Sequence, residues 1–98
     1  MEHSLEAQFA EIDLLTGCSN LVSFTKGIQS SFGNADLSAV TLIGIDVHQL
    51  RYVNSRYGFE GGDQLLRWLG IALRDEMGNT VYRIAGDAFV IVILGGSS

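Results

Sequence analysis

The fold is decided by residues 81–93, VYRIAGDAFVIVI. Two apolar runs rich in β-branched residues flank the four residues Ala85, Gly86, Asp87 and Ala88, a pattern that is typical of a β-hairpin. Gly-Asp is ordinary turn chemistry, because Gly turns easily and Asp bonds nearby backbone groups. The alternative is that the tip of the hairpin points its carboxylate at a charged ligand. The hairpin alone leaves both interpretations open.

Upstream of the hairpin, the sequence predicts one further strand and several helices. Residues 39–46, AVTLIGID, are a continuous apolar run that ends in a carboxylate, which favours a buried strand. Apolar residues at helical spacing predict helices over residues 1–12, 21–32, 48–57 and 61–77. We expect the strand to join the hairpin across the helix pair. The prediction is therefore an α+β fold, an antiparallel sheet with helices on one face.

Composition limits the class of protein. Ninety-eight residues suit a single domain, and a chain that is 47% hydrophobic and 17% charged is not a disordered tail. A net charge of -5 argues against nucleic acid as a partner, because such surfaces need clustered Lys and Arg. A lone cysteine, Cys18, suits a reducing compartment, and no apolar run reaches membrane-spanning length. We therefore expect a cytoplasmic protein without direct membrane insertion.

Two carboxylates are expected to meet at one edge of the sheet. Asp46 ends the first predicted strand and Asp87 lies at the hairpin tip. Two carboxylates with a backbone oxygen are hard ligands that suit Mg²⁺ carrying a phosphate. The structural alternative makes Asp46 a helix N-cap and Asp87 a turn former.

Asn54 and Asp63 form a second candidate pair. Asp accepts hydrogen bonds and Asn both donates and accepts them, so together they match the N–H groups and the carbonyl oxygen of guanine. The alternative is that Asn54 ends one helix and Asp63 caps the next. The glycines of YGFEGGD, residues 57–63, favour a tight turn that places Asp63 at a helix start.

Taken together, these segments resemble the GGDEF domain of the diguanylate cyclase family. DLLTG with Asn20 resembles the family's D-x-L-T-G-L-x-N-R, and IDVHQLRYVNSRYGFEGGD resembles I-D-x-D-x-F-K-x-x-N-D-x-x-G-H-x-x-G-D. RIAGDAF stands where R-Y-G-G-D-E-F is usual. Three ordered motifs at near-family spacing are far more specific than one. We divide the chain into an N-terminal linker helix, residues 1–12, and a truncated GGDEF-like domain, residues 13–98.

The resemblance implies a ferredoxin-like fold, related to nucleotide cyclases, that condenses two GTP into cyclic di-GMP across a dimer. Its residue roles are carried over position by position. It implies Mg²⁺ binding by Asp46, the Val47 carbonyl and Asp87, with Asp87 also in the catalytic centre. It further implies guanine recognition by Asn54 and Asp63, and contact between the phosphates and the backbone of Gly86.

Departures from the family pattern weigh against catalysis. Ala88 replaces the signature glutamate, and loss of a catalytic carboxylate typically costs orders of magnitude in rate. Ala85 replaces the first signature glycine, and His48 replaces the second aspartate of the strand-end motif. Residues 76–79, EMGN, lack the Arg and Asp of the family's inhibitory R-x-x-D site. The chain also stops before the family's last helix, strand and basic residues, so we expect an incomplete sheet, an exposed edge at residues 39–46, and a homo-oligomer.

Three functions are consistent with these features. The first is a degenerate GGDEF domain in cyclic di-GMP signalling, inactive as a cyclase, that binds GTP with Mg²⁺ and acts as a regulatory or dimerisation module. The second is a purely structural domain that binds other signalling domains or proteins. The third is a working diguanylate cyclase. Ala88 and the short chain favour the first.

Overall fold

The computed structural model describes residues 10–32 and 40–94. Most of the predicted N-terminal helix and the predicted loop at 33–38 lie outside these residues. The elements in chain order are β1 (Ser19–Asn20), α2 (Leu21–Gly27), a π-helical turn η1 (Ile28–Phe32), β2 (Val40–Asp46), α3 (Leu50–Met77), a 3-10 turn η3 (Gly78–Thr80), β3 (Val81–Ala85) and β4 (Ala88–Leu94). β2 begins one residue after the predicted start of the run 39–46, β3 and β4 form the predicted hairpin, and the α+β class is confirmed.

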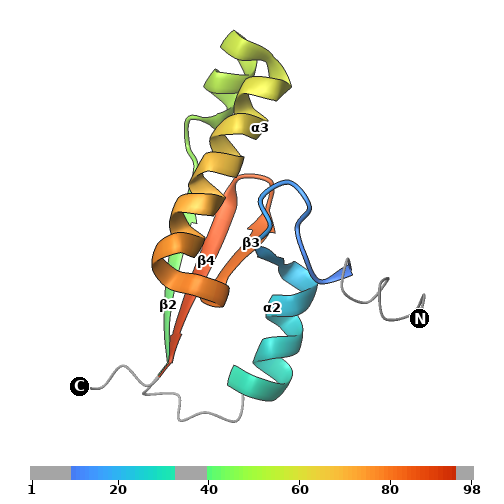
Figure 1. Cartoon of the computed structure of the whole chain (residues 1–98), viewed down its shortest axis with the longest axis vertical. Helices are drawn as coiled ribbons and strands as arrows, with labels where there is room; N and C mark the ends of the chain where they lie inside the picture. The colour runs from blue at the N-terminus through green and yellow to red at the C-terminus, as the bar shows by residue number, and fades with distance from the viewer. Residues whose placement is uncertain (1–9, 33–39, 95–98) are drawn as a thin grey trace.

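The sheet has the strand order β1-β3-β4-β2, so β4 lies between the other two long strands (Figure 1). β4 pairs antiparallel with β3 and with β2, as predicted. The two-residue strand β1, which the sequence did not predict, pairs parallel with β3 through Ser19 and Tyr82. The sheet is therefore mixed, with an antiparallel centre.

The core lies between α3 and the sheet. Leu66 of α3 packs with Val81, Phe89 and Ile91, and Cys18 completes the buried cluster. These strand residues alternate with others that point to the opposite face. There the ring of Tyr82 meets the ring of Phe24 from α2, with centroids 5.5 Å apart. Helices therefore contact both faces of the sheet, and the expectation of helices on one face only is wrong, because α2 packs behind β3.

A glycine bends α3 near its beginning. The sequence predicts two helices on either side of Gly58, and the structure has this break: Gly58 is non-helical, with φ 77° and ψ 173°, so Leu50–Met77 consists of two helical parts that meet at a kink. This backbone region is essentially restricted to glycine. The bend directs the first part of α3, which follows β2, toward the hairpin tip.

Two helix ends are closed by residues suited to capping, as the sequence around Asn20 and Gly78 predicts. The side chain of Asn20 accepts a hydrogen bond from the N–H of Ser23 at 3.0 Å and so caps α2. Gly78 ends α3 with a positive φ of 67°. Each feature satisfies backbone groups that a helix end leaves free.

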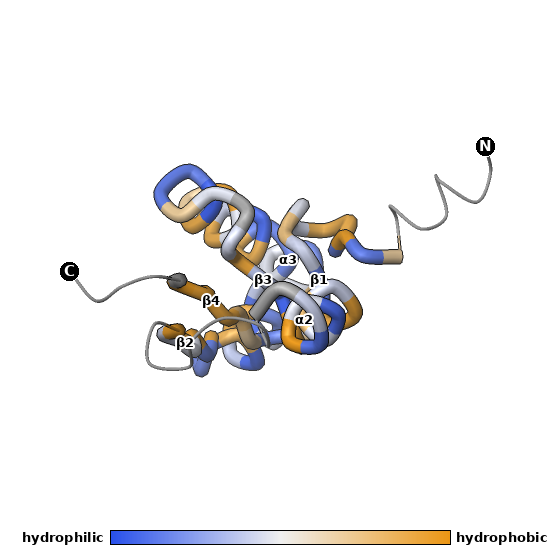
Figure 2. Tube along the Cα trace, turned by 90° about the horizontal axis from the view of Figure 1, so that it is seen from below, coloured by the Kyte–Doolittle hydropathy of each residue, from blue (hydrophilic) through white to orange (hydrophobic). Residues whose placement is uncertain are grey.

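β2 forms the far edge of the described sheet and is mostly exposed. Leu42 is 56% exposed and Ile43 41% exposed. Figure 2 shows hydrophobic residues along β2 and β4, at the side of the sheet remote from β1. The prediction of a buried strand here is wrong within the described residues, whereas the expected exposed edge is confirmed, because no described strand pairs with the outer side of β2.

Candidate functional site

The strand pairing brings the two predicted carboxylates to one end of the sheet. Asp46, the last residue of β2, pairs with Ala88, the first residue of β4. Asp87 precedes Ala88 in the turn, and its carbonyl accepts a hydrogen bond from the N–H of Val47 at 2.8 Å. Asp46 and Asp87 are both exposed. The N-cap of α3 is Gln49, so Asp46 does not have the capping role of the structural alternative.

A pocket of about 730 Å³ opens beside this tip. It lies between the hairpin turn, the segment that follows β2 and the start of α3. Four of the predicted site residues line it, whereas Asp46 and Asp63 do not. The lining residues are Val47, His48, Leu50, Arg51, Asn54, Phe59, Gly86 and Asp87.

Four of these lining residues were not expected at the site from the sequence: His48, Leu50, Arg51 and Phe59. Asn54 lies four residues after Leu50 and three residues after Arg51, so it neighbours each of them on the helix surface. This spacing relative to Asn54, a predicted site residue, could have indicated from the sequence that Leu50 and Arg51 lie at the site. Arg51 adds a permanent positive charge to a pocket whose lining also includes Asp87.

Asn54 is held against the second half of the helix. A side chain at Gly62 would collide with the Asn54 amide, so glycine is required for this close approach. The Oδ1 atom of Asn54 is buried and has no hydrogen-bond partner within the described part of the chain. An unpaired buried acceptor costs about 1–3 kcal/mol. Because Oδ1 faces Gly62, a ligand N–H group would reach it only after the Asn54 side chain turned toward the pocket that it lines.

Asp63 follows Gly62 and is half-buried. It lies five residues after the break at Gly58, within the second helical part of α3, so it is not the N-cap of that part and the structural alternative is wrong. Its neighbour Gly62 packs against Asn54, so the two predicted base-reading residues are close in the chain fold, but only Asn54 lines the pocket.

No described carboxylate replaces the signature glutamate that is absent at Ala88. Across residues 10–32 and 40–94 there is no group of three or more His, Cys, Asp or Glu side chains placed to hold a metal. Ala88 occupies the position opposite Asp46. The described oxygen donors are thus limited to Asp46, Asp87 and backbone carbonyls.

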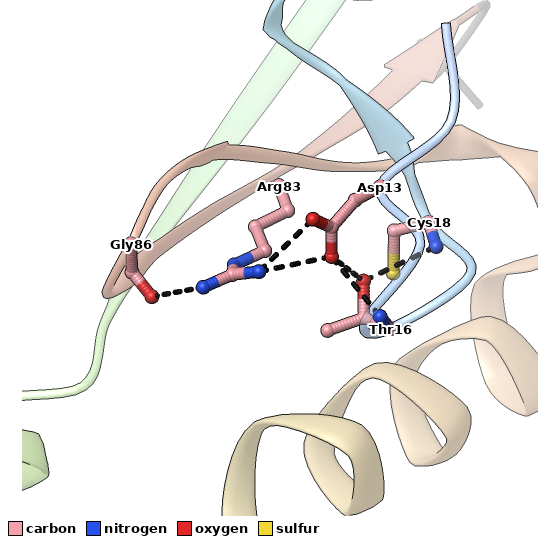
Figure 3. Close-up of polar contacts among 5 residues, drawn as sticks. All are labelled: Asp13, Thr16, Cys18, Arg83 and Gly86. Atoms are coloured by element: carbon pink, nitrogen blue, oxygen red, sulfur yellow. Dashed lines mark hydrogen bonds and ion pairs between the residues drawn. The ribbon is translucent and has the colours of Figure 1, made fainter. Parts of the chain in front are cut away.

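A second polar cluster supports the hairpin from the other side (Figure 3). The Nη1 atom of Arg83 donates to both carboxylate oxygens of Asp13 at 3.0 Å, and its Nη2 atom donates to the carbonyl of Gly86 at 2.8 Å. Thr16 donates to Asp13 through its N–H at 3.0 Å and its hydroxyl at 2.6 Å. Burial alone would raise the pKa of Asp13, but the hydrogen bonds from Thr16 and Arg83 and the charge of Arg83 outweigh it and hold the pKa below its ordinary value of 3.8.

Cys18 lies beside this cluster and is buried. Burial raises the pKa of its thiol, so the reactive thiolate is disfavoured.

Comparisons with known proteins identify relatives that are similar over most of this chain. Diguanylate cyclase DgcS of Shewanella oneidensis is 31% identical over 98 residues, which cover 96% of this chain and 32% of that protein. Cyclic di-GMP phosphodiesterase PdeR of Escherichia coli is 31% identical over 85 residues, or 85% of this chain and 13% of that protein. The chain thus spans about a third or less of these relatives.

A solved structure shows the same fold. The coiled coil and GGDEF domain of DgcB from Caulobacter crescentus, in complex with c-di-GMP, superposes with a TM-score of 0.86 at 20% identity, over 99% of this chain and 53% of that one. The family described as diguanylate cyclase, GGDEF domain, matches residues 10–98. With nearly the whole chain matched, this protein belongs to the GGDEF domain family.

Proposed function

We propose that this GGDEF domain binds GTP with Mg²⁺ in the pocket beside the hairpin tip, does not condense it, and acts in cyclic di-GMP signalling as a regulatory module. The single observation that carries this proposal is the pairing of Asp46 with Ala88. It keeps one family carboxylate on β2 while an alanine methyl stands where the family has glutamate. We further propose a cytoplasmic location.

The oxygen donors at the tip fit Mg²⁺. Asp46, Asp87 and the Val47 carbonyl are all hard ligands, and Mg²⁺ commonly binds one or two carboxylates and fills its remaining positions with water and phosphate. Bound there, Mg²⁺ would neutralise phosphate charge and acidify an attacking hydroxyl. The residues of this chain would hold the triphosphate near Gly86, whose backbone lines the pocket and where no other group lies within 4 Å of an added Cβ.

Asn54 and Asp63 would select the base. Once turned toward the pocket, the unpaired Oδ1 of Asn54 would accept from a guanine N–H group, and the carboxylate of Asp63, which lies behind the pocket lining, would accept from the remaining ones. Adenine offers a different order of donors and acceptors. The preference for GTP over ATP would therefore depend on these two side chains.

Condensation requires removal of the proton from a 3′-hydroxyl, and this chain has one carboxylate fewer with which to promote it. General-base contributions are typically 10²–10⁴-fold, so the loss at position 88 is sufficient to make turnover negligible. The remaining carboxylates would serve binding, which needs less charge than the transition state.

The test is a pair of measurements on the purified chain with GTP and Mg²⁺. We expect calorimetry to detect GTP binding that Asp63→Ala removes, and chromatography to detect no cyclic di-GMP after long incubation. Product from the unaltered chain would establish the working cyclase instead. Absence of binding at millimolar GTP would establish the structural interaction domain.

The exposed edge strand favours a second function, the interaction domain. β2 presents an unpaired edge and the exposed apolar residues Leu42 and Ile43. Such an edge readily pairs with another chain. We propose that a second copy pairs here antiparallel about Ile43, which sets each Asp46 opposite a Val40 and keeps the two carboxylates apart.

A further inference from the structure

The hairpin tip separates two pockets. On one side it borders the candidate nucleotide site, with Gly86 and Asp87 in the lining. On the other side lies a pocket of about 340 Å³ whose lining includes Asp13, Arg83 and again Gly86. Gly86 is thus a shared wall, and a shift of its backbone changes both spaces together.

Arg83 connects this wall to the N-terminal loop, residues 13–17. Its guanidinium joins the carbonyl of Gly86 to the carboxylate of Asp13. The Arg83 and Asp13 side chains are only 15% and 21% exposed, so solvent screens the ion pair weakly. The register of β3 and β4 shifts between Arg83 and Ala85, so the ladder is irregular just before the turn. The side-chain bond to Gly86 therefore fixes a turn that strand pairing leaves less constrained.

The loop is also tied to the segment that precedes it. Asn20 donates through its side chain to the carbonyl of Ala10 at 2.7 Å and through its backbone to the carbonyl of Glu11 at 3.0 Å. On its other side, Arg74 of α3 donates to the carbonyl of Thr16 at 3.3 Å. Residues 10–12 are thus held at Asn20 and continue directly into Asp13, so their movement reaches Asp13 through the backbone.

We infer that Asp13 and Arg83 are positioning residues for the hairpin tip, so that displacement of the N-terminal loop changes the position of Asp87 and the affinity of the candidate site for Mg²⁺ and GTP. The part that concerns affinity rests on the proposed function. The part that concerns the position of the tip rests on the contacts of Arg83 alone.

The N–H of Val47 reports the tip without any ligand, because it donates to the Asp87 carbonyl. Hydrogen exchange at this amide measures how often the tip leaves β2. The experiment compares the unaltered chain with Asp13→Asn and Arg83→Lys. Lysine keeps the charge but lacks the planar fork that bonds two acceptors at once. Ile91→Val, a core variant remote from the ion pair, controls for a general loss of stability, and Glu11→Gln controls for the exposed Lys26 ion pair.

We expect both Asp13→Asn and Arg83→Lys to speed exchange at Val47 about fivefold or more, in line with loss of a charged hydrogen bond. We expect neither control to do so, and we expect the GTP affinity to fall in the same two variants. Exchange at Val47 that is unchanged, or equally fast in Ile91→Val, would overturn the inference. If the unaltered chain binds no Mg²⁺ and GTP, the proposed function fails, and exchange at Val47 still decides whether the ion pair positions the tip.

Discussion

Asp46 and Ala88 face each other across β2 and β4 at the end of the sheet that carries the hairpin turn. A carboxylate on one strand thus meets a methyl group on its neighbour. The strands pair as they would with a carboxylate at both positions, but the negative charge at position 88 is missing. A glutamate at this position would restore it.

Ala88→Glu should strengthen Mg²⁺ binding about fivefold or more, because an added carboxylate near Asp46 and Asp87 attracts the cation. Titration with Mg²⁺ followed by NMR would measure it. Ala85→Glu is the matched control, since Ala85 pairs with Ala88 but lines the other pocket. Equal gains in both variants would show a general charge effect and not a metal site.

Asn54→Ala should have opposite effects on stability and binding. It removes a buried unpaired oxygen, so the free energy of unfolding should stay level or rise. GTP affinity should fall by about 1–3 kcal/mol, because one base contact is lost. Urea denaturation and calorimetry check the two effects, with the exposed Gln64→Ala as control. A fall in stability with unchanged affinity would indicate a packing role instead.

Gly58→Ala should destabilise the fold by about 1–3 kcal/mol, because alanine is strained at φ 77° and ψ 173°. Gly44→Ala is the control, since no group lies within 4 Å of an added Cβ there and its φ is not positive. Urea denaturation gives both values. If the two variants were equally stable, the bend in α3 would not depend on glycine.

Acid should weaken the fold through Asp13. Its pKa is lower in the folded chain than its ordinary value of 3.8, so the stabilisation is present above that value and is lost as the pH falls through the folded pKa. Asp13→Asn should therefore lose about 1–3 kcal/mol at neutral pH and show a shallower decline below pH 4. Thermal melts across this range compare the two chains, and parallel curves would contradict the assignment.

Ile43→Lys should shift the chain from dimer toward monomer, because a charge on an edge strand opposes pairing with a second copy. Sedimentation velocity over a range of concentrations measures the shift. Ile71→Lys is the control, since Ile71 is similarly exposed, at 54% against 41%, but lies on α3. Dissociation by both variants would place the interface elsewhere.

Strand and helix positions followed from the sequence because the local signals agreed with one another. The runs at β2 and β4, the cap at Asn20 and the stop at Gly78 each have a local physical cause. The burial of β2 could not be predicted, since an apolar run does not reveal whether a neighbouring strand covers it. The packing of α2 behind β3 likewise depends on the parallel pairing of β1, a two-residue contact without a sequence signature.

The site was predictable where strand ends place residues and unpredictable where long-range packing does. Asp87, Gly86 and Asn54 lie at the pocket because each is close to a turn or a helix start. The bond between Asp13 and Arg83 joins residues 70 positions apart, so spacing alone could not indicate it. The orphaned oxygen of Asn54 depends on the approach of Gly62, which only the bend at Gly58 produces.

The strand order has a consequence for how the chain folds during synthesis. β4 holds β2 on one side and β3 on the other, and β3 in turn holds β1, so each strand pair includes a strand of the hairpin. The ribosome makes this hairpin after all the other described elements. Until the hairpin leaves the ribosome, Val40–Asp46 has no described strand to pair with. This apolar segment can then pair wrongly with other nascent chains. The nascent chain is therefore most exposed to misassociation in the interval between completion of β2 and release of β4.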